Sequence, residues 1–286
     1  MSTHVNSKKM TIPKITGMKG KGRIVSLTAY TTPMAKLMDA IVDIIIVGDS
    51  LGMVAYGMDS TMPVTLDMMI RHATAVVTGA TQACVVVDLP FATYQESPEI
   101  AYRNAARVMA ESGAQAVKIE VSEEMVETVA FLARRGIPVM PHIGLTPQYA
   151  NTLGGFKVQG KSDEEASRLV ALARSLERAS AFALLVEGTH ESAARRITEA
   201  VTIPVIGIGA SPACDGQVLV TEDVLGLFSD YTPKFAKRYT NLAESVQAAF
   251  AEFASEVRLG SFPAAQHCFG VNAKERVETR LGTPNP

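Results

Sequence analysis

Short runs of β-branched and other apolar residues alternate with longer stretches of helical periodicity along most of the chain. The seven clear runs lie at 24–29, 43–48, 83–88, 115–120, 137–142, 181–187 and 203–208, and an eighth is expected within 217–228. Between Asp49 and Gly209 the pair of apolar run and helical stretch recurs about every 32 residues, the size of one βα unit. This alternation is typical of a parallel sheet whose two faces are covered by helices.

Two architectures fit such a sheet: an open, doubly wound sheet and a closed (β/α)8 barrel. Seven or eight units favour the barrel, and the dinucleotide-binding fingerprint G-x-G-x-x-G is absent after the first run. No Pro/Ser-rich linker or long charge run divides the chain. We therefore expect an α/β protein with a single (β/α)8 TIM barrel domain over 1–286, with loose ends at 1–20 and at about 270–286.

Several helix boundaries are expected from local signals. Ser or Thr precedes Pro at 32–33, 97–98 and 211–212, which places an N-cap hydroxyl before a residue suited to the first helical position. The segment 240–258 has the periodicity of an amphipathic helix.

Charge and cysteine content exclude several classes of protein. Among 286 residues, 27 Lys and Arg against 29 Asp and Glu give a net charge of -2, which leaves little electrostatic basis for binding nucleic acid or an anionic membrane. The first residues lack the apolar region of a secretory signal, and no apolar run approaches the ~18 residues that span a bilayer. Cys84, Cys214 and Cys268 form no CxxC pair. We expect a cytoplasmic protein without disulfides or zinc.

Polar residues follow the apolar runs at the ends where a barrel carries its reactive groups. They are Asp49 with Ser50, Asp88, Lys118, Glu120, His142 and Glu187. Singly, each has a structural explanation: Asp49 and Asp88 could hydrogen-bond their own turns, and His142 could be a core histidine. Together, four carboxylates at one end of a barrel would repel one another and lose solvation. A shared cation would relieve that repulsion.

Carboxylates without paired histidines or thiolates favour a hard ion such as Mg²⁺. Asp49 and Asp88 would be direct ligands, and Glu120 a third ligand or one acting through water. Lys118 lies two residues from Glu120 on one strand, so both side chains face the lumen. This lysine could neutralise a substrate carboxylate or oxyanion, or form a Schiff base, although a bound metal makes the Schiff base redundant.

Eight ordered segments carry a resemblance to a known family. They are VGDSLGM (47–53), DLPF (88–91), VKIE (117–120), HIGLTPQ (142–148), GGFKVQG (154–160), IPVIGIGA (203–210), DGQVLV (215–220) and PKFAKR (233–238). The chain from about 21 to 269 resembles the ketopantoate hydroxymethyltransferases. The resemblance implies a Mg²⁺-dependent (β/α)8 barrel of the phosphoenolpyruvate/pyruvate superfamily, commonly assembled as a decamer.

The resemblance also implies an activity and a set of residues. The family transfers a hydroxymethyl group from 5,10-methylenetetrahydrofolate to 3-methyl-2-oxobutanoate, through a Mg²⁺-stabilised enolate, to give 2-dehydropantoate for pantothenate and coenzyme A. By motif, one Mg²⁺ per subunit is held by Asp49, Asp88 and Glu120. The substrate contacts are Asp49, Ser50, Asp88 and Lys118. Glu187 is the proton acceptor, Lys118 acts with it, and His142 is an accessory residue at the same mouth.

Two other functions are compatible with the same residues. One is a Mg²⁺-dependent lyase or aldolase of the same superfamily, which would cleave a 2-oxo acid; the VKIE and GLTPQ segments favour the transferase instead. The other is a non-catalytic barrel that binds a structural ion. Lys118 and Glu187 argue against it, because structural metal binding needs neither.

Overall fold

The computed structural model describes residues 9–228 and 233–270. These residues divide into two compact units, one of residues 9–221 with 233–236 and one of residues 222–228 with 237–270. The expectation of a single domain over 1–286 stays a prediction.

The first unit contains a closed barrel of eight parallel strands in sequence order, β1 to β8. Their bounds are β1 Ile24–Thr28, β2 Ile44–Val47, β3 Cys84–Asp88, β4 Ala116–Glu120, β5 Val139–Gly144, β6 Leu184–Glu187, β7 Val205–Ile208 and β8 Gly216–Leu219. Pairing of β1 with β8, with Ile24 opposite Gly216, closes the barrel. The predicted (β/α)8 architecture is therefore confirmed, and the eighth strand begins one residue before the expected window.

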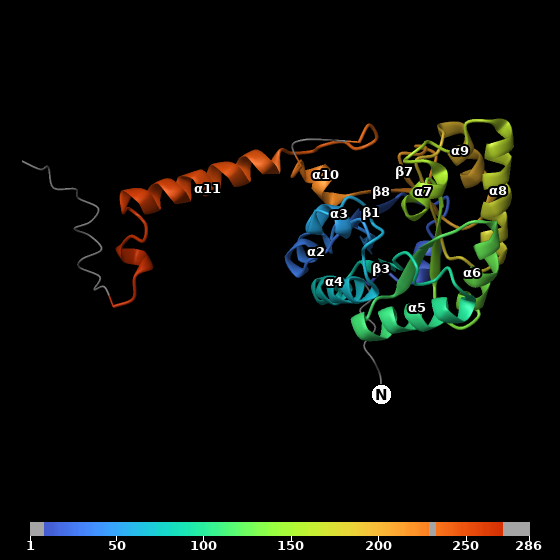
Figure 1. Cartoon of the computed structure of the whole chain (residues 1–286), viewed down its shortest axis with the longest axis horizontal. Coiled ribbons are helices and arrows are strands. Elements are labelled where there is room, and N and C mark those ends of the chain that lie inside the picture. Colours follow the sequence, from blue (N-terminus) through green and yellow to red (C-terminus); the bar gives the residue numbers. More distant parts are fainter. Residues whose placement is uncertain (1–8, 229–232, 271–286) are drawn as a thin grey trace, which may run out of the picture. The chain divides into compact units, whose positions relative to one another are not determined.

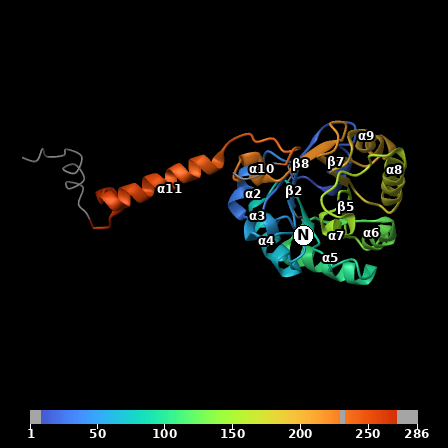
Figure 2. The same cartoon turned by 45° about the horizontal axis from the view of Figure 1, so that its top comes forward.

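Helices surround these strands, as Figures 1 and 2 show for α4, α5, α6, α8 and α9. Across both units, the helices of the described residues are α1 Ile12–Thr16, α2 Thr32–Met38, α3 Leu51–Tyr56, α4 Leu66–Gly79, α5 Pro98–Ser112, α6 Val126–Ala133, α7 Ala150–Leu153, α8 Asp163–Arg178, α9 Glu191–Ala200, α10 Thr221–Leu225 and α11 Leu242–Leu259. Short 3-10 turns lie at η1 Glu123–Met125, η2 Pro147–Tyr149 and η3 Ala265–His267.

The local signals for helix starts were right in part. Ser97 caps α5 as expected, accepting a hydrogen bond from the backbone N–H of Ile100 at 3.3 Å. The cap of α2 is Thr31, one residue earlier than predicted. The start predicted at 211–212 is wrong, because the chain returns to β8 at once and no helix separates it from β7. There the Ser211 hydroxyl accepts from the backbone N–H of Ala213 at 3.0 Å, within a turn.

Apolar side chains form two layers in the first unit. The larger layer lies between the strands and the surrounding helices, and the smaller fills the barrel interior with residues such as Ile24, Ile44, Met140 and Phe182. Each strand contacts one apolar layer on each of its faces, which is why the strand residues are apolar on both faces.

Part of the N-terminal segment that we expected to be loose is ordered. Residues 12–16 form α1, and Ile15 is fully buried in the interior layer. The Thr16 hydroxyl donates to the carbonyl of Phe182 at 3.2 Å, which ties α1 to the amino-terminal end of the barrel. A helix of this length leaves too few apolar repeats to be recognised by periodicity. The remaining expected loose ends, 1–8 and 271–286, lie outside the described residues.

In the second unit, the predicted amphipathic helix is present as α11, and none of its residues is buried. Within 9–228 and 233–270, no helix is both long enough and apolar enough to cross a membrane.

Candidate active site

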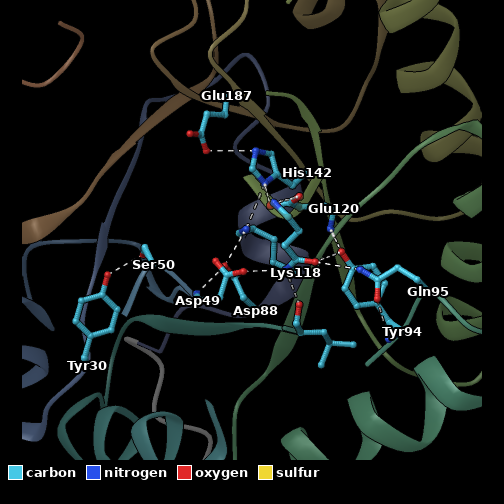
Figure 3. A network of polar contacts seen from close by, with 12 residues as sticks. Tyr30, Asp49, Ser50, Asp88, Tyr94, Gln95, Lys118, Glu120, His142 and Glu187 are labelled. Atoms are coloured by element: carbon cyan, nitrogen blue, oxygen red, sulfur yellow. Dashed lines mark hydrogen bonds and ion pairs between the residues drawn. The ribbon is translucent and has the colours of Figure 1, made fainter. Parts of the chain in front are cut away.

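The seven predicted site residues lie together at the carboxyl ends of five neighbouring strands, β2 to β6 (Figure 3). They are Asp49, Ser50, Asp88, Lys118, Glu120, His142 and Glu187. The parallel register produces this gathering, because it pairs Asp88 with Lys118 and Glu120 with His142 across adjacent strands. Lys118 and Glu120 share the inward face of β4, as the two-residue spacing predicts. The expected convergence of these side chains at one end of the barrel is confirmed.

An ion pair between Lys118 and Asp88 lies at the centre of the site. The Lys118 Nζ is 2.9 Å from Asp88 Oδ2, and the backbone N–H of Asp49 donates to the same oxygen at 3.2 Å. The other oxygen, Asp88 Oδ1, is buried without a hydrogen-bond partner. Burial raises the pKa of Asp88 to about 7 although Lys118 opposes the shift, and the neighbouring Asp49 raises it further. One buried carboxylate oxygen is therefore left for a ligand.

Lys118 is the single lysine or arginine in this cluster. Burial alone would lower its pKa, but Asp88 and Asp49 outweigh that effect and raise it. Burial also raises the pKa of Asp49 and of Glu120, with Lys118 opposing both shifts. One ammonium group thus faces three buried carboxyl groups, an arrangement in which a further positive charge is stabilising.

His142 connects this cluster with Glu187. Its Nδ1 is 3.4 Å from Lys118 Nζ, and its Nε2 is 3.3 Å from Glu187 Oε2, a close contact without good hydrogen-bond alignment. Burial and the charge of Lys118 lower the pKa of His142, so the ring is neutral near pH 7. A lysine ammonium can only donate, so Nδ1 accepts and the ring proton is on Nε2, facing Glu187. Glu187 has 20% of its side chain exposed, more than Asp88 or His142.

Gly144 brings the ends of β5 and β6 together. Its φ is +92°, and a Cβ there would lie 2.3 Å from Thr189 Oγ1 and 2.4 Å from the carbonyl oxygen of Glu187. Only glycine combines this backbone conformation with so close an approach. The position of Glu187 relative to His142 therefore depends on this glycine.

Four site residues were not predicted from the sequence. The Tyr30 hydroxyl hydrogen-bonds Ser50 Oγ at 2.9 Å. Gln148 contacts both Asp49 and Glu120, and Tyr94 and Gln95 hydrogen-bond the Gln148 side chain. Gln148 lies in HIGLTPQ, a segment that carried the family resemblance without assigning this residue a role. Their position in the chain could have indicated them, because all four lie in loops or turns that follow strands, where barrel sites are built.

The donor set suits a hard cation. Within the part of the chain that the structure describes, no three acidic, histidine or cysteine side chains already enclose a metal position. Mg²⁺ does not need such an enclosure, since it keeps several waters and binds through one or two carboxylates. The buried, unpartnered Asp88 Oδ1 beside Asp49 meets that requirement.

Comparison with known sequences places the chain in a family. The profile of the ketopantoate hydroxymethyltransferases matches residues 9–265. The chain belongs to the ketopantoate hydroxymethyltransferase family. It is 66% identical over 271 residues to 3-methyl-2-oxobutanoate hydroxymethyltransferase 1 of Hahella chejuensis, covering 95% of this chain and 98% of the relative. It is 56% identical over 274 residues to the Bordetella petrii protein of that name, covering 96% and 100%.

Solved structures of similar fold are more distant in sequence. A phosphonomutase-like protein from Burkholderia cenocepacia J2315 has a TM-score of 0.59 at 17% identity, over 80% of this chain and 93% of the other. Phosphonopyruvate hydrolase in complex with oxalate and Mg²⁺ has a TM-score of 0.55 at 14% identity, over 95% and 97%. A 2,3-dimethylmalate lyase of the PEP mutase/isocitrate lyase superfamily has 0.54 at 18%, over 91% and 94%. These likenesses support the barrel fold expected for a ketopantoate hydroxymethyltransferase, which is a transferase.

Proposed function

We propose that the chain transfers a hydroxymethyl group from 5,10-methylenetetrahydrofolate to 3-methyl-2-oxobutanoate, giving 2-dehydropantoate for pantothenate synthesis. The carrying observation is that the Glu187 carboxylate faces a buried cluster in which Lys118 and Asp88 are paired at 2.9 Å. A carboxylate that could accept a proton, near an ammonium group that could stabilise negative charge, supports removal of a proton beside a ketone. The names of the relatives support the same reaction.

The cluster is suited to binding a 2-oxo acid. Lys118 supplies an ammonium group for the substrate carboxylate or for the developing oxyanion, and the Ser50 hydroxyl, fixed by Tyr30, supplies a further hydrogen bond. Asp49 and Asp88 would hold one Mg²⁺ per subunit, with Glu120 as a third ligand or through water. When bound, the ion would act as a Lewis acid toward the ketone oxygen.

Glu187 would remove the C3 proton of the substrate. The neutral His142 ring lies with its Nε2 3.3 Å from Glu187 Oε2, so it contacts the carboxylate that would accept the proton. His142 is thus an accessory to the proton acceptor. The deprotonated C3 would then form a carbon–carbon bond to the methylene carbon of the folate, and water would supply the hydroxyl group as the two C–N bonds of that carbon break. Tetrahydrofolate leaves, and its two nitrogens take up the proton removed from C3 and one proton of the water.

The expected setting of the enzyme follows from the family. We propose a cytoplasmic homo-oligomer, a decamer by resemblance, with small-molecule substrates and no nucleic-acid or membrane partner. The net charge of -2 supports the absence of a polyanionic partner.

A Mg²⁺-dependent lyase acting on a 2-oxo acid is the second candidate. It is favoured by one observation, the fold likeness to a 2,3-dimethylmalate lyase. Formation of 2-dehydropantoate only when methylenetetrahydrofolate is present would support the transferase, and cleavage of a 2-oxo acid without folate would support the lyase.

Proton NMR of 3-methyl-2-oxobutanoate in D₂O, with Mg²⁺ and without folate, tests the proposed proton acceptor. We expect the wild-type protein to exchange the C3 proton, and Glu187→Gln to lose exchange while its Mg²⁺ affinity stays within about twofold. Glu199→Gln is the matched control, because Glu199 is an exposed glutamate in α9, the helix that follows β6. Unchanged exchange in Glu187→Gln would exclude Glu187 as the proton acceptor.

A further inference from the structure

The side chain of Gln148 lies between the two carboxylates that flank the Asp88–Lys118 pair. Its Nε2 donates to Asp49 Oδ2 at 2.8 Å and to the carbonyl oxygen of Leu89 at 3.0 Å. Its backbone N–H donates to Glu120 Oε2 at 2.9 Å. Gln148 is 4% exposed, and η2, the turn that follows β5, places it there. Gln148 therefore contacts both the Asp49 carboxylate, which follows β2, and the Glu120 carboxylate, which ends β4.

The amide of Gln148 has every hydrogen-bonding position filled. Besides the two donors on Nε2, its Oε1 accepts from the Tyr94 hydroxyl at 2.7 Å and from Gln95 Nε2 at 3.1 Å. Rotating the amide by 180° would bring Oε1 against the Asp49 carboxylate and the Leu89 carbonyl, both of which can only accept. The contacts thus permit one orientation, with the donor toward Asp49.

Tyr94 holds the Gln148 amide in this orientation. Its side chain is fully buried, its hydroxyl donates to Gln148, and the same oxygen accepts from the backbone N–H of Glu120 at 3.1 Å. Burial and the nearby Glu120 carboxylate raise the pKa of Tyr94, so the hydroxyl keeps its proton. Figure 3 shows Tyr94 and Gln95 on the side of the cluster opposite Ser50 and Tyr30.

We propose that Gln148 is a positioning residue, held by Tyr94, that fixes where the Asp49 and Glu120 carboxylates stand and so sets the affinity of the site for a divalent cation. A neutral amide does this without adding charge to a cluster that already has more carboxylates than ammonium groups. The inference rests on the proposed function only in taking Mg²⁺ as the cation.

The first test replaces Gln148 by methionine, which has a similar length and no hydrogen-bonding amide. Removing a partner that orients a metal ligand costs about 10- to 100-fold in metal affinity. We expect calorimetric titration of the free protein with MgCl₂ to show at least about a tenfold higher Kd for Gln148→Met. The rate of C3 proton exchange should fall at low Mg²⁺ and recover in large part at saturating Mg²⁺, since protein groups already fill every hydrogen-bonding position of the Gln148 amide.

Gln115→Met is the matched control. Gln115 is a half-buried glutamine next to the amino end of β4, and its Oε1 accepts from the backbone N–H of Val85 at 2.7 Å. This variant also loses a hydrogen-bonded amide, but at the opposite end of the barrel. We expect it to lose stability without a change in Mg²⁺ affinity, and an equal loss of affinity in both variants would overturn the proposal.

Tyr94→Phe provides a second and milder test should Gln148→Met fold poorly. Removing only the hydroxyl should raise the Kd for Mg²⁺ several-fold, because the Gln148 amide loses one of the hydrogen bonds that orient it. In the double variant Tyr94→Phe/Gln148→Met the two effects should add only in part, since Tyr94 acts through Gln148 and also binds the backbone N–H of Glu120. Additive effects, or a Tyr94→Phe protein that binds Mg²⁺ as tightly as wild type, would overturn the assignment.

These measurements separate the inference from the proposed function. If the wild-type protein binds Mg²⁺ but exchanges no C3 proton, the proposed function fails while the affinity ratios still decide the role of Gln148. A wild-type protein that binds no Mg²⁺ would overturn the inference itself.

Discussion

Acidification should weaken Mg²⁺ binding around neutral pH, because Asp88 titrates there. Burial raises the pKa of this carboxyl from its ordinary value of 3.8 to about 7, even though Lys118 lies 2.9 Å away. A proton and a divalent cation therefore compete for the same carboxylate near pH 7. The perturbation is a change from pH 8 to pH 6, which leaves Lys118 charged because Asp88 and Asp49 hold its pKa above the ordinary value.

The expected size follows from the fraction of Asp88 that is ionised. With a pKa of about 7, roughly nine-tenths is ionised at pH 8 and roughly one-tenth at pH 6, so the Mg²⁺ affinity should fall about tenfold, or about 1.4 kcal/mol. The Mg²⁺ affinity must fall, and not rise, on acidification, because a raised pKa means that this carboxylate binds a proton more tightly than an exposed aspartate does. Burial raises the pKa of Asp49 as well, so protonation of Asp49 would act in the same direction.

Calorimetric titration with MgCl₂ at pH 6, 7 and 8 measures this directly. Repeating each titration in two buffers of different ionisation enthalpy counts the protons released, and we expect about one proton per Mg²⁺ at pH 6 and close to none at pH 8. Equal affinities at pH 6 and pH 8, with no proton release at pH 6, would refute the assignment of Asp88 as a ligand with a raised pKa.

Two substitutions test the ends of the barrel separately. Gly144→Ala forces a side chain into a backbone at φ +92° and toward the Glu187 carbonyl, so urea unfolding should show a loss on the order of 1–3 kcal/mol or more, with slower C3 exchange in the folded protein. Wild-type stability and exchange would contradict this reading. Asp215→Asn breaks the 2.8 Å pair with Lys19 at the amino end of the barrel, where Asp215 also accepts from the backbone N–H of Val205. The free energy of unfolding, measured with urea, should fall by about 3 kcal/mol, while the kcat of the folded enzyme stays unchanged. A lower kcat in fully folded protein would contradict this and show that the two ends are coupled.

The gathering of the charged site residues was predictable because it depends on little more than strand polarity. Once the apolar runs are identified as parallel strands, a residue at the end of each run must lie at the same edge of the barrel. Asp88 and Glu187 end β3 and β6, and Asp49 follows β2 by two residues. Small errors in strand bounds do not alter this result, since they move a residue along its strand and not to another edge.

Gln148 and Tyr94 were not predictable in the same way. Both lie in segments that follow strands, where the chain has no period that fixes the direction of a side chain. Their contacts depend on the path of two loops that are distant in sequence, after β3 and after β5. The predicted helix start at 211–212 failed for a related reason, because a cap signal describes only a few residues and β8 begins at Gly216, too soon for a helix.

The two ends of the barrel differ in how completely their buried charges are compensated. At the amino end, the buried Asp215 carboxylate has both Lys19 and the backbone N–H of Val205 as partners. At the carboxyl end, Lys118 alone faces several carboxyl groups, and Asp88 Oδ1 has no partner. An anionic 2-oxo acid entering such a site would meet net repulsion unless a cation entered with it or before it. For the proposed reaction, this uncompensated charge would therefore tie the binding of a 2-oxo acid to that of a divalent ion.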